Sequence, residues 1–362
     1  MTRPRISTDG FQTATIKDVA ARAGVSKRTV SRVMNEQPHI TADTRDRVLQ
    51  AIERLGYRPN PAARRLASGK SHLIGLFHSV CTPPDAELVE QVALAMAGER
   101  YRLLVCSSEH RAPNAAEEFA ALARVVPIDG AILCAPLSEQ LTFGPAFRAQ
   151  QIPCVRIGPT TGMHSISSDD RGAARQMTRY LASLGHERIG FVCGPEEHDS
   201  VQQRRQGFLD GMQSAGLPID AGNILSGADT FDAGVQCGRR LLSDAAQRPT
   251  AIFAATDTMA AGVLRAAHEI GIAVPAALSV AGFGDQPIAS QAWPALTTMR
   301  PPVRALAVRA AAMLLELLQG ASADISQSPV LAAEIVLRDS TGAVRAKHQN
   351  SNGAVPLVAP RI

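Results

Sequence analysis

Aromatic residues are scarce in this sequence, and long apolar segments are missing. Its 362 residues include one Trp, three Tyr and ten Phe. No run of about 18 apolar residues occurs, so no membrane-spanning helix is predicted. Residues 1–12 lack the apolar core of a secretory signal, and we expect them to form a polar, disordered tail. These absences favour a cytoplasmic globular protein that does not contact a membrane.

The sequence also lacks the usual signals of a disulfide framework, a metal site or an enzyme. Its six cysteines form no CxxC pair, and several lie within apolar strand-like runs, which is typical of reduced core residues. No P-loop, GxSxG, HExxH or EF-hand pattern occurs, and Gly282-x-Gly284 lacks the spacing of a dinucleotide-binding loop. The pair Asp169–Asp170 is more typical of a loop end and a helix cap than of acid–base catalysis. We therefore predict no catalytic residue, no metal site and no cofactor.

Positive charge is concentrated at one end of the chain. Residues 1–72 contain 14 Lys and Arg against 6 Asp and Glu, whereas the remainder contains 23 against 27. A basic segment joined to a mildly acidic body predicts a polyanionic partner at the N-terminal end only.

Three short helices are predicted between residues 13 and 57. Thr15 caps the first, whose apolar residues recur at i, i+3, i+4 and i+7. Gly24–Val25 forms a turn, and Ser26 caps a second helix from Lys27 to about Asn35. A third helix begins after Thr41 and ends at Gly56. Three helices with a glycine-containing turn between the first two indicate a helix-turn-helix module.

The outer face of the second helix has the chemistry of a DNA-reading surface. Arg28, Arg32 and Asn35 recur along it, and Lys27 stands at its start. Arg and Lys bridge acceptors on base edges in the major groove, and Asn pairs with adenine. Helix N-termini with flanking Ser, Thr and Lys groups hold phosphates.

A short stretch, residues 60–69, follows the three helices. Asn60 and Pro61 suit the start of a helix, and Gly69 suits its end. A helix of about seven residues is marginal alone, and Leu66 is its only large apolar side chain. The stretch is therefore either a helix that folds on a partner or an inert Pro/Ala linker.

The run TIKDVAARAGVSKRTVSRVMN, residues 15–35, resembles the DNA-binding head of the lactose-repressor (LacI) family, and so do Thr44–Arg45, residues 55–60, Ala63 and Leu66. The resemblance implies three base-reading residues, Lys27, Arg28 and Arg32. It implies phosphate or supporting contacts from Thr15, Ser26, Thr29, Ser31 and Asn35. Residues 60–72 would form the family's hinge helix, in which Leu66, with Ala63 packed beside it, wedges into the minor groove and bends the duplex.

Residues 73–340 alternate between apolar strand-like runs and helix-like stretches. The strands are predicted at 73–77, 102–106, 130–134, 153–157, 189–193, 251–254 and 278–283. The helices are predicted at 86–99, 115–124, 172–184, 205–215, 232–242, 258–270 and 304–318. This alternation predicts an α/β body with parallel strands, and its length favours two doubly wound lobes over one sheet. Ligands bind such folds outside the carboxyl ends of the strands.

The body also contains phrases that resemble the family's effector domain, at 184–190, 204–208, 256–257, 279–285 and 294–298. The implied fold is that of periplasmic sugar-binding proteins, with three crossovers between lobes. The implied domains are a DNA-binding domain at 1–59, a hinge at 60–72, an effector-binding and dimerisation domain at 73–340, and a disordered tail at 341–362. Within the body, we assign 73–167 and 297–321 to the N-lobe, and 168–296 and 322–340 to the C-lobe. The tail lacks a leucine heptad, so a homodimer is expected.

Candidate effector-binding residues follow strand ends or begin helices: Ser79, Ser200, Arg204, Phe231, Thr256, Asp257 and Asp285. Sugars need paired hydrogen bonds and an apolar face, which Arg, Asp and Phe supply. Arg204 is the leading candidate. If it does not bind the effector, it would be a surface or helix-capping arginine, and Phe231 would instead belong to the core of a lobe. The family usually has Asn at the position of Thr256 and often an acidic residue at that of Gly284. Either Asp285 takes over that contact, or the effector differs from a simple hexose.

The sequence therefore predicts an allosteric, dimeric repressor of carbohydrate-use genes. It would bind a pseudo-palindromic double-stranded operator and respond to a small sugar-like effector between the lobes. One alternative is a regulator that uses a purine or a sugar phosphate as corepressor. Another is a sugar-binding transport component, which would carry a secretion signal and lack the basic head. An enzyme is the least favoured class, since no nucleophile, base or cofactor motif occurs.

Overall fold

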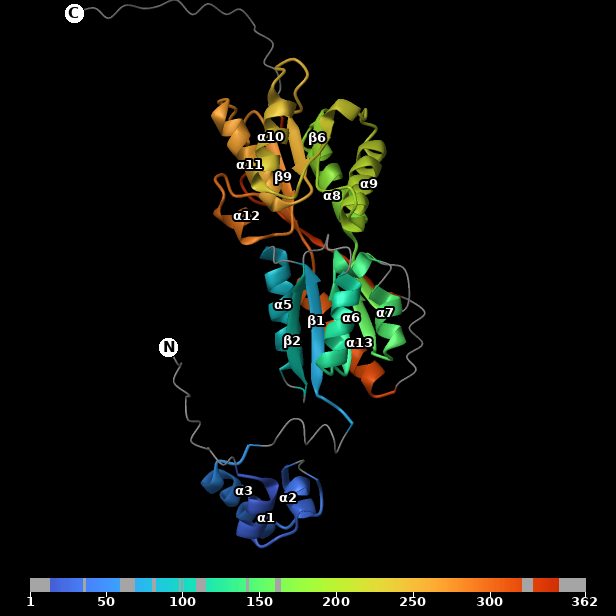
Figure 1. Cartoon of the computed structure of the whole chain (residues 1–362). Helices are drawn as coiled ribbons and strands as arrows, with labels where there is room; N and C mark the ends of the chain where they lie inside the picture. The colour runs from blue at the N-terminus through green and yellow to red at the C-terminus, as the bar shows by residue number, and fades with distance from the viewer. Residues whose placement is uncertain are drawn as a thin grey trace, which may run out of the picture. The chain divides into compact units, whose positions relative to one another are not determined.

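The computed structural model describes residues 14–34, 37–58, 69–79, 83–97, 99, 101–108, 115–140, 143–159, 164–320 and 328–344. The chain forms two compact units, Met1–Ser71 and His72–Ile362, which we call the head and the body (Figure 1). Asn35, the proposed hinge residues Ala63 and Leu66, the N-terminal tail 1–12 and the last residues, 345–362, lie outside the described residues. Within those described ranges, no helix is long and apolar enough to cross a bilayer.

The head contains three helices: α1 (Ile16–Ala23), α2 (Lys27–Met34) and α3 (Ala42–Leu55). Val19, Val30 and Val48 are fully buried where these helices meet. The Ser26 hydroxyl accepts a hydrogen bond from Thr29 N, and the Thr41 hydroxyl accepts one from Thr44 N, as the sequence predicts for N-caps. The left-handed backbone at Gly24, with φ of 64°, ends α1 and sets the turn into α2.

The N-lobe of the body is a parallel sheet in the order β11-β5-β4-β3-β1-β2. Its strands are β1 (Leu73–Ser79), β2 (Arg102–Ser108), β3 (Gly130–Cys134), β4 (Cys154–Ile157), β5 (Ser165–Ser168) and β11 (Val330–Leu331). Successive residues of β1 pack on opposite faces. Leu76 lies in the core formed with α5 (Pro83–Met96) and α13 (Val303–Leu318), and Phe77 packs against α6 (Ala115–Val125) and α7 (Phe143–Ala149).

The C-lobe sheet has the order β12-β10-β9-β8-β6-β7, with only β12 antiparallel to its neighbour. Its strands are β6 (Ile189–Cys193), β7 (Ile224–Ser226), β8 (Ala251–Ala254), β9 (Ser279–Phe283), β10 (Thr297–Arg300) and β12 (Glu334–Val336). Helices α8 (Asp170–Ser183) and α9 (Asp199–Ser214) cover one face. Helices α10 (Phe231–Leu242), α11 (Asp257–Glu269) and α12 (Pro287–Gln291) cover the other (Figure 1).

The chain passes between the lobes three times, after β5, after β10 and between β11 and β12. Two assigned boundaries need correction. Residues 297–300 form β10 of the C-lobe instead of opening the N-lobe segment, because Thr297 and Met299 pair with β9 and are fully buried there. The segment 322–340 is divided, because Val330–Leu331 pairs with β5 in the N-lobe before β12 returns to the C-lobe.

Helices α8 and α9 pack closely because small residues lie between them. A Cβ atom added at Gly207 would collide with the carbonyl oxygen of Arg171 and with the side chain of Ala174. The two helices carry Asp170 and Arg204, so their separation sets the distance between these groups.

We expect Gly207→Ala to lower the free energy of unfolding by about 1–3 kcal/mol, because the overpacking outweighs the better helix propensity of alanine. Gln213→Ala, at an exposed position of the same helix, is the matched control and should be close to neutral. Urea unfolding of the two variants checks this. Equal stability would mean that α8 and α9 can separate without cost.

Candidate functional site

The exposed surface of α2 carries the cations that the sequence assigns to DNA reading. Lys27 and Arg28 are exposed at its first turn. Arg32 is half-buried; its Nε donates to Gln37 Oε1 at 3.2 Å and its Nη2 to Pro38 O at 3.5 Å. Lys27 and Arg28 therefore extend into solvent, whereas Arg32 is held against the loop before α3.

The polar residues around α2 are largely used in capping. The backbone N and the hydroxyl of Thr15 both donate to Asp18, at 2.8 and 2.7 Å. The Ser26 and Thr29 hydroxyls lie 2.9 Å apart. Ser31 is half-buried on the same helix. Thr15, Ser26 and Thr29 therefore make local hydrogen bonds at helix N-termini, the ends of a helix that favour an anion.

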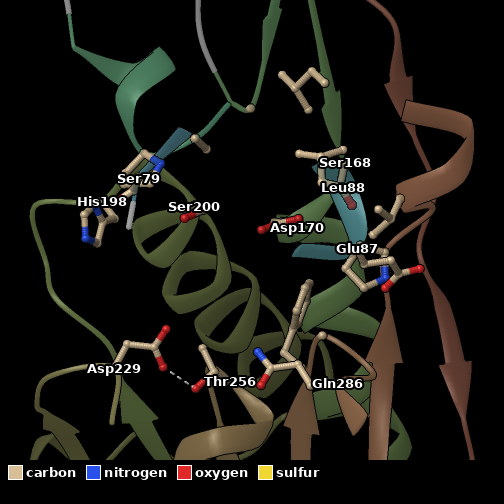
Figure 2. Close-up of a pocket in the computed structure, with 18 of the residues that line it drawn as sticks. Ser79, Glu87, Leu88, Ser168, Asp170, His198, Ser200, Asp229, Thr256 and Gln286 are labelled. Atoms are coloured by element: carbon tan, nitrogen blue, oxygen red, sulfur yellow. Dashed lines mark hydrogen bonds between the residues drawn. The ribbon is translucent and has the colours of Figure 1, made fainter. Parts of the chain in front are cut away.

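The body contains a cavity of about 1100 Å³ between its two lobes. Side chains from the carboxyl ends of β1 and β5 and from α5 line it on the N-lobe side, and loops after β6, β7, β8 and β9 line it on the C-lobe side. Figure 2 shows Ser79, Ser200, Asp170, Thr256 and Asp229 around this space. The cavity thus lies where a doubly wound fold binds its ligand.

Arg204 lies at the base of the cavity in a fixed orientation. Its Nε and Nη2 are each 2.9 Å from Asp170 Oδ2, and its Nη1 donates to Ala255 O at 2.9 Å. Its guanidinium carbon lies 3.9 Å from the centroid of the Phe283 ring. These contacts use three of the five N–H groups of the guanidinium, so two remain to meet a ligand.

Asp170 is a cavity residue that sequence reasoning assigned no ligand role. Its neighbour Asp169 has the expected role, since it caps α8 by accepting from Gly172 N at 2.8 Å. Asp170 instead points towards α9, and its side chain is only 8% exposed. The local sequence does not distinguish the roles of Asp169 and Asp170, because the partner of Asp170 is 34 residues away.

Asp229 is a second cavity residue that the sequence did not suggest. The Thr256 hydroxyl accepts from Met259 N at 3.3 Å as the cap of α11, and it donates to Asp229 Oδ1 at 2.6 Å (Figure 2). The only proton of the Thr256 hydroxyl is therefore already donated. The second carboxylate oxygen of Asp229, which takes no part in that bond, is the acceptor that this corner of the cavity offers.

The structure does not bring Asp257, Asp285 and Phe231 into the cavity wall. Asp257 is fully buried and accepts from Gln286 N at 2.8 Å and from the Thr298 hydroxyl at 2.5 Å. Burial raises its pKa to about 6. It braces the loop after β9, and Gln286 of that loop lines the cavity in its place.

The carboxylate of Asp285 is held between two arginines, Arg300 and Arg338, each at 2.5 Å. Its backbone has a φ of 50°, which turns the loop after β9. Phe231 begins α10 and is 39% exposed. Phe283, almost fully buried, supplies the aromatic ring at the cavity, and Arg204 covers it.

The charge around the cavity is mostly negative. Among the described lining residues, the carboxylates are Glu87, Glu90, Asp170 and Asp229, and the only permanently charged cation is Arg204. That cation already pairs with Asp170. The cavity therefore has few means of compensating an anionic ligand.

Comparison with known proteins identifies the parts of the chain. Residues 15–60 match the family described as bacterial regulatory proteins, lacI family, and residues 178–341 match the periplasmic binding protein-like domain. The HTH-type transcriptional repressor CytR of Escherichia coli K12 is 32% identical over 338 residues, which cover 91% of this chain and 97% of that protein. The chain belongs to the LacI family.

Other known regulators also match this chain over most of its length. The HTH-type transcriptional regulator GalS of Salmonella typhimurium is 35% identical over 340 residues, covering 90% of this chain and 96% of that protein. The lac repressor dimer bound to operator and the anti-inducer ONPF covers 92% of this chain and all of its own, with 28% identity and a TM-score of 0.82. The CelR–cellobiose complex has 27% identity and a TM-score of 0.67, covering 90% of this chain and 99% of its own. The chain is thus a helix-turn-helix transcriptional regulator with a two-lobed α/β body.

Because Arg28 is exposed and has no structural role in the head, Arg28→Ala should weaken binding to a selected operator by about 1–3 kcal/mol without lowering thermal stability. The operator can be selected from a random DNA library and binding measured by fluorescence anisotropy. Arg54→Ala, which removes the same charge from the exposed end of α3, is the control. An equal loss on operator and on random DNA would make Arg28 a phosphate contact instead.

Arg204→Ala should lower the free energy of unfolding by about 3–5 kcal/mol, because it leaves the buried carboxylate of Asp170 without its cation. Arg205→Ala, the next residue of the same helix and outside the cavity wall, is the matched control and should cost less than about 1 kcal/mol. Chemical unfolding measures both. If the two variants are equally stable, water or another group compensates Asp170.

Proposed function

We propose that this LacI family member is a cytoplasmic repressor of carbohydrate-use genes, controlled by a small, uncharged, hydroxyl-rich effector. The effector would occupy the cavity between the lobes. As a homodimer, the protein would place two heads on the half-sites of a pseudo-palindromic operator. The match to CytR, GalS and the lac repressor dimer on its operator supports the DNA-binding part of this proposal.

The observation that carries the effector class is the pairing of Arg204 with Asp170. A phosphate group would meet one cation that is already compensated, together with the carboxylates of Glu87, Glu90 and Asp229. Hydroxyl groups suit the same surface, since they donate to carboxylates and accept from the two remaining N–H groups of Arg204. A sugar or a nucleoside therefore fits better than a sugar phosphate or a nucleotide.

A purine used as corepressor is the second candidate. A repressor named PurR, from Photorhabdus laumondii, is 34% identical over 309 residues, covering 84% of this chain and 90% of that protein. The cavity volume of about 1100 Å³ also exceeds the needs of a single hexose ring. Nucleosides and free bases therefore belong in any effector search.

The effector would act by shifting the balance between two arrangements of the lobes. A ligand changes such a balance only by its different affinity for the two states. The cavity walls come from both lobes, so a bound ligand stabilises the closed arrangement. The N-lobe begins directly after the head segment, at β1, so a movement of this lobe would reach the proposed hinge at 60–72, where Leu66 and Ala63 would contact the minor groove.

The proposal predicts a difference within pairs of compounds. Glucose, ribose, cytidine and adenosine would each be compared with its own monophosphate by thermal shift on the full chain. A neutral member that binds should raise stability by about 2.7 kcal/mol at 100 Kd, and its phosphate should raise it far less. Arg204→Ala should abolish the shift, and Arg205→Ala should keep it. Stronger stabilisation by the phosphorylated members would contradict the proposed effector class.

A further inference from the structure

Helix α9 differs from the neighbouring helices in how its N-terminus is capped. In helices α8, α10 and α11, the side chain of the preceding residue accepts a hydrogen bond from a backbone N–H of the first turn. These capping residues are Asp169, Thr230 and Thr256. The residue before α9 is His198, whose side chain makes no cap hydrogen bond. The first backbone N–H groups of α9 therefore need an acceptor from elsewhere.

That acceptor comes from the other lobe. Glu139 ends a 3₁₀ turn, η1 (Leu137–Glu139), which follows β3 in the N-lobe. Its Oε2 accepts a hydrogen bond from Asp199 N, the first residue of α9, at 2.9 Å. A carboxyl group keeps an oxygen that can accept this bond whether it is ionised or protonated. The contact therefore joins the two lobes beside the effector cavity.

Glu139 is also costly to bury in this position. Its side chain is only 7% exposed, and its Oε1 has no hydrogen-bond partner among the described residues. The nearest cationic candidate, His198 Nδ1, is 4.0 Å from Oε2. A carboxylate with one unsatisfied oxygen is expensive to bury. Separation of the lobes would break this contact and return the carboxylate to water.

Helix α9 carries three residues of the cavity wall: Ser200, Val201 and Arg204. We propose that Glu139 is an inter-lobe clamp, a positioning residue that caps α9 across the cleft in the closed state and releases it when the lobes separate. The clamp would hold Ser200 and Arg204 towards the N-lobe side of the cavity. Its consequence for effector binding rests on the function proposed above, whereas its effect on α9 does not.

The clamp makes closure sensitive to pH. Burial raises the pKa of Glu139 from 4.5 to about 7, and the nearby Asp199 adds to the rise. The amides of Asp199 and Ser200 and the cation of Arg204 act in the opposite direction. Because the folded, closed state has the raised pKa, the stabilisation from protonation is present below the ordinary value and is lost as pH rises through about 7. The closed state is therefore favoured at the acidic end of this window.

The other charged or titratable groups described against Glu139 are His198, Asp199 and Arg204, all at the start of α9. A titrating His198 would also respond near neutral pH. A test must therefore separate the carboxyl group from the imidazole. Glutamine at position 139 does so, since its amide oxygen still accepts from Asp199 N but its side chain does not titrate.

The test is hydrogen exchange of the amides of Asp199 and Ser200 in the full chain, without effector or DNA, at pH 6 and pH 8. Exchange is expressed as protection relative to the intrinsic rate at each pH. The variants are Glu139→Ala, Glu139→Gln and the control Glu118→Gln, which removes an exposed carboxylate from α6. The first-turn amides of Gly172 and Ala233 serve as internal references, since their caps lie within their own lobe.

In the unmodified protein and in Glu118→Gln, protection should be greater at pH 6 than at pH 8. Glu139→Ala should reduce it roughly tenfold at both values, without change at Gly172 and Ala233. Glu139→Gln should retain the protection and lose its pH dependence.

Unchanged protection in Glu139→Ala, or greater protection of the unmodified protein at pH 8, would overturn the proposal. So would an unaltered pH profile in Glu139→Gln, which would assign the response to His198. Failure to find an effector bears on the proposed function alone.

Discussion

The ion pair between Asp170 and Arg204 holds together the part of the body on which the cleft is built. Asp170 follows the first crossover from the N-lobe, and Arg204 lies one turn into α9. Through Ala255 O and the Phe283 ring, the guanidinium also contacts the ends of β8 and β9. Four chain segments thus meet at one planar cation. Removing the buried Asp170 and Arg204 side chains from water is costly. The hydrogen bonds between them and to Ala255 O, each at 2.9 Å, compensate for this cost.

Local chemistry explains how far the sequence could predict the fold. The strands 130–134, 189–193 and 251–254 lie at their predicted bounds, because they are apolar on both faces and bordered by helix-like stretches. Two caps in the head, at Ser26 and Thr41, follow from a side chain that accepts from the backbone N three residues later. Strands β5, β7 and β11 are only two to four residues long, so their place depends on pairing with distant strands. Helix α9 starts earlier than predicted, and its first backbone N–H bonds to Glu139, which is 60 residues away.

In the candidate site too, local sequence predicts some residues, whereas contacts with distant residues place the others. Ser79, Ser200, Arg204 and Thr256 line the cavity, because strand ends and the first turns of helices face it in this fold. Asp257 also begins a helix, but Gln286 N and the Thr298 hydroxyl turn its carboxylate away. Asp170 and Asp229 are held in the cavity wall by hydrogen bonds from residues that are distant in sequence. The direction of a side chain at a strand end is set by such contacts, which no sequence pattern contains.

The two departures from the LacI pattern have a common structural setting. Gly284 has a φ of 128°, which strains any other residue, and a side chain there would crowd Asp257 and Gln286. The backbone at this position therefore favours glycine over an acidic residue. Asp229, held by the hydroxyl of Thr256, supplies a carboxylate from another loop of the same wall.

The three crossovers differ in mechanical stiffness. The second contains Pro301 and Pro302, whose rings fix φ and which donate no backbone hydrogen bond. The third contains Ala332 and Ala333, which have neither restriction. The φ angles of the second crossover are therefore more restricted than those of the third.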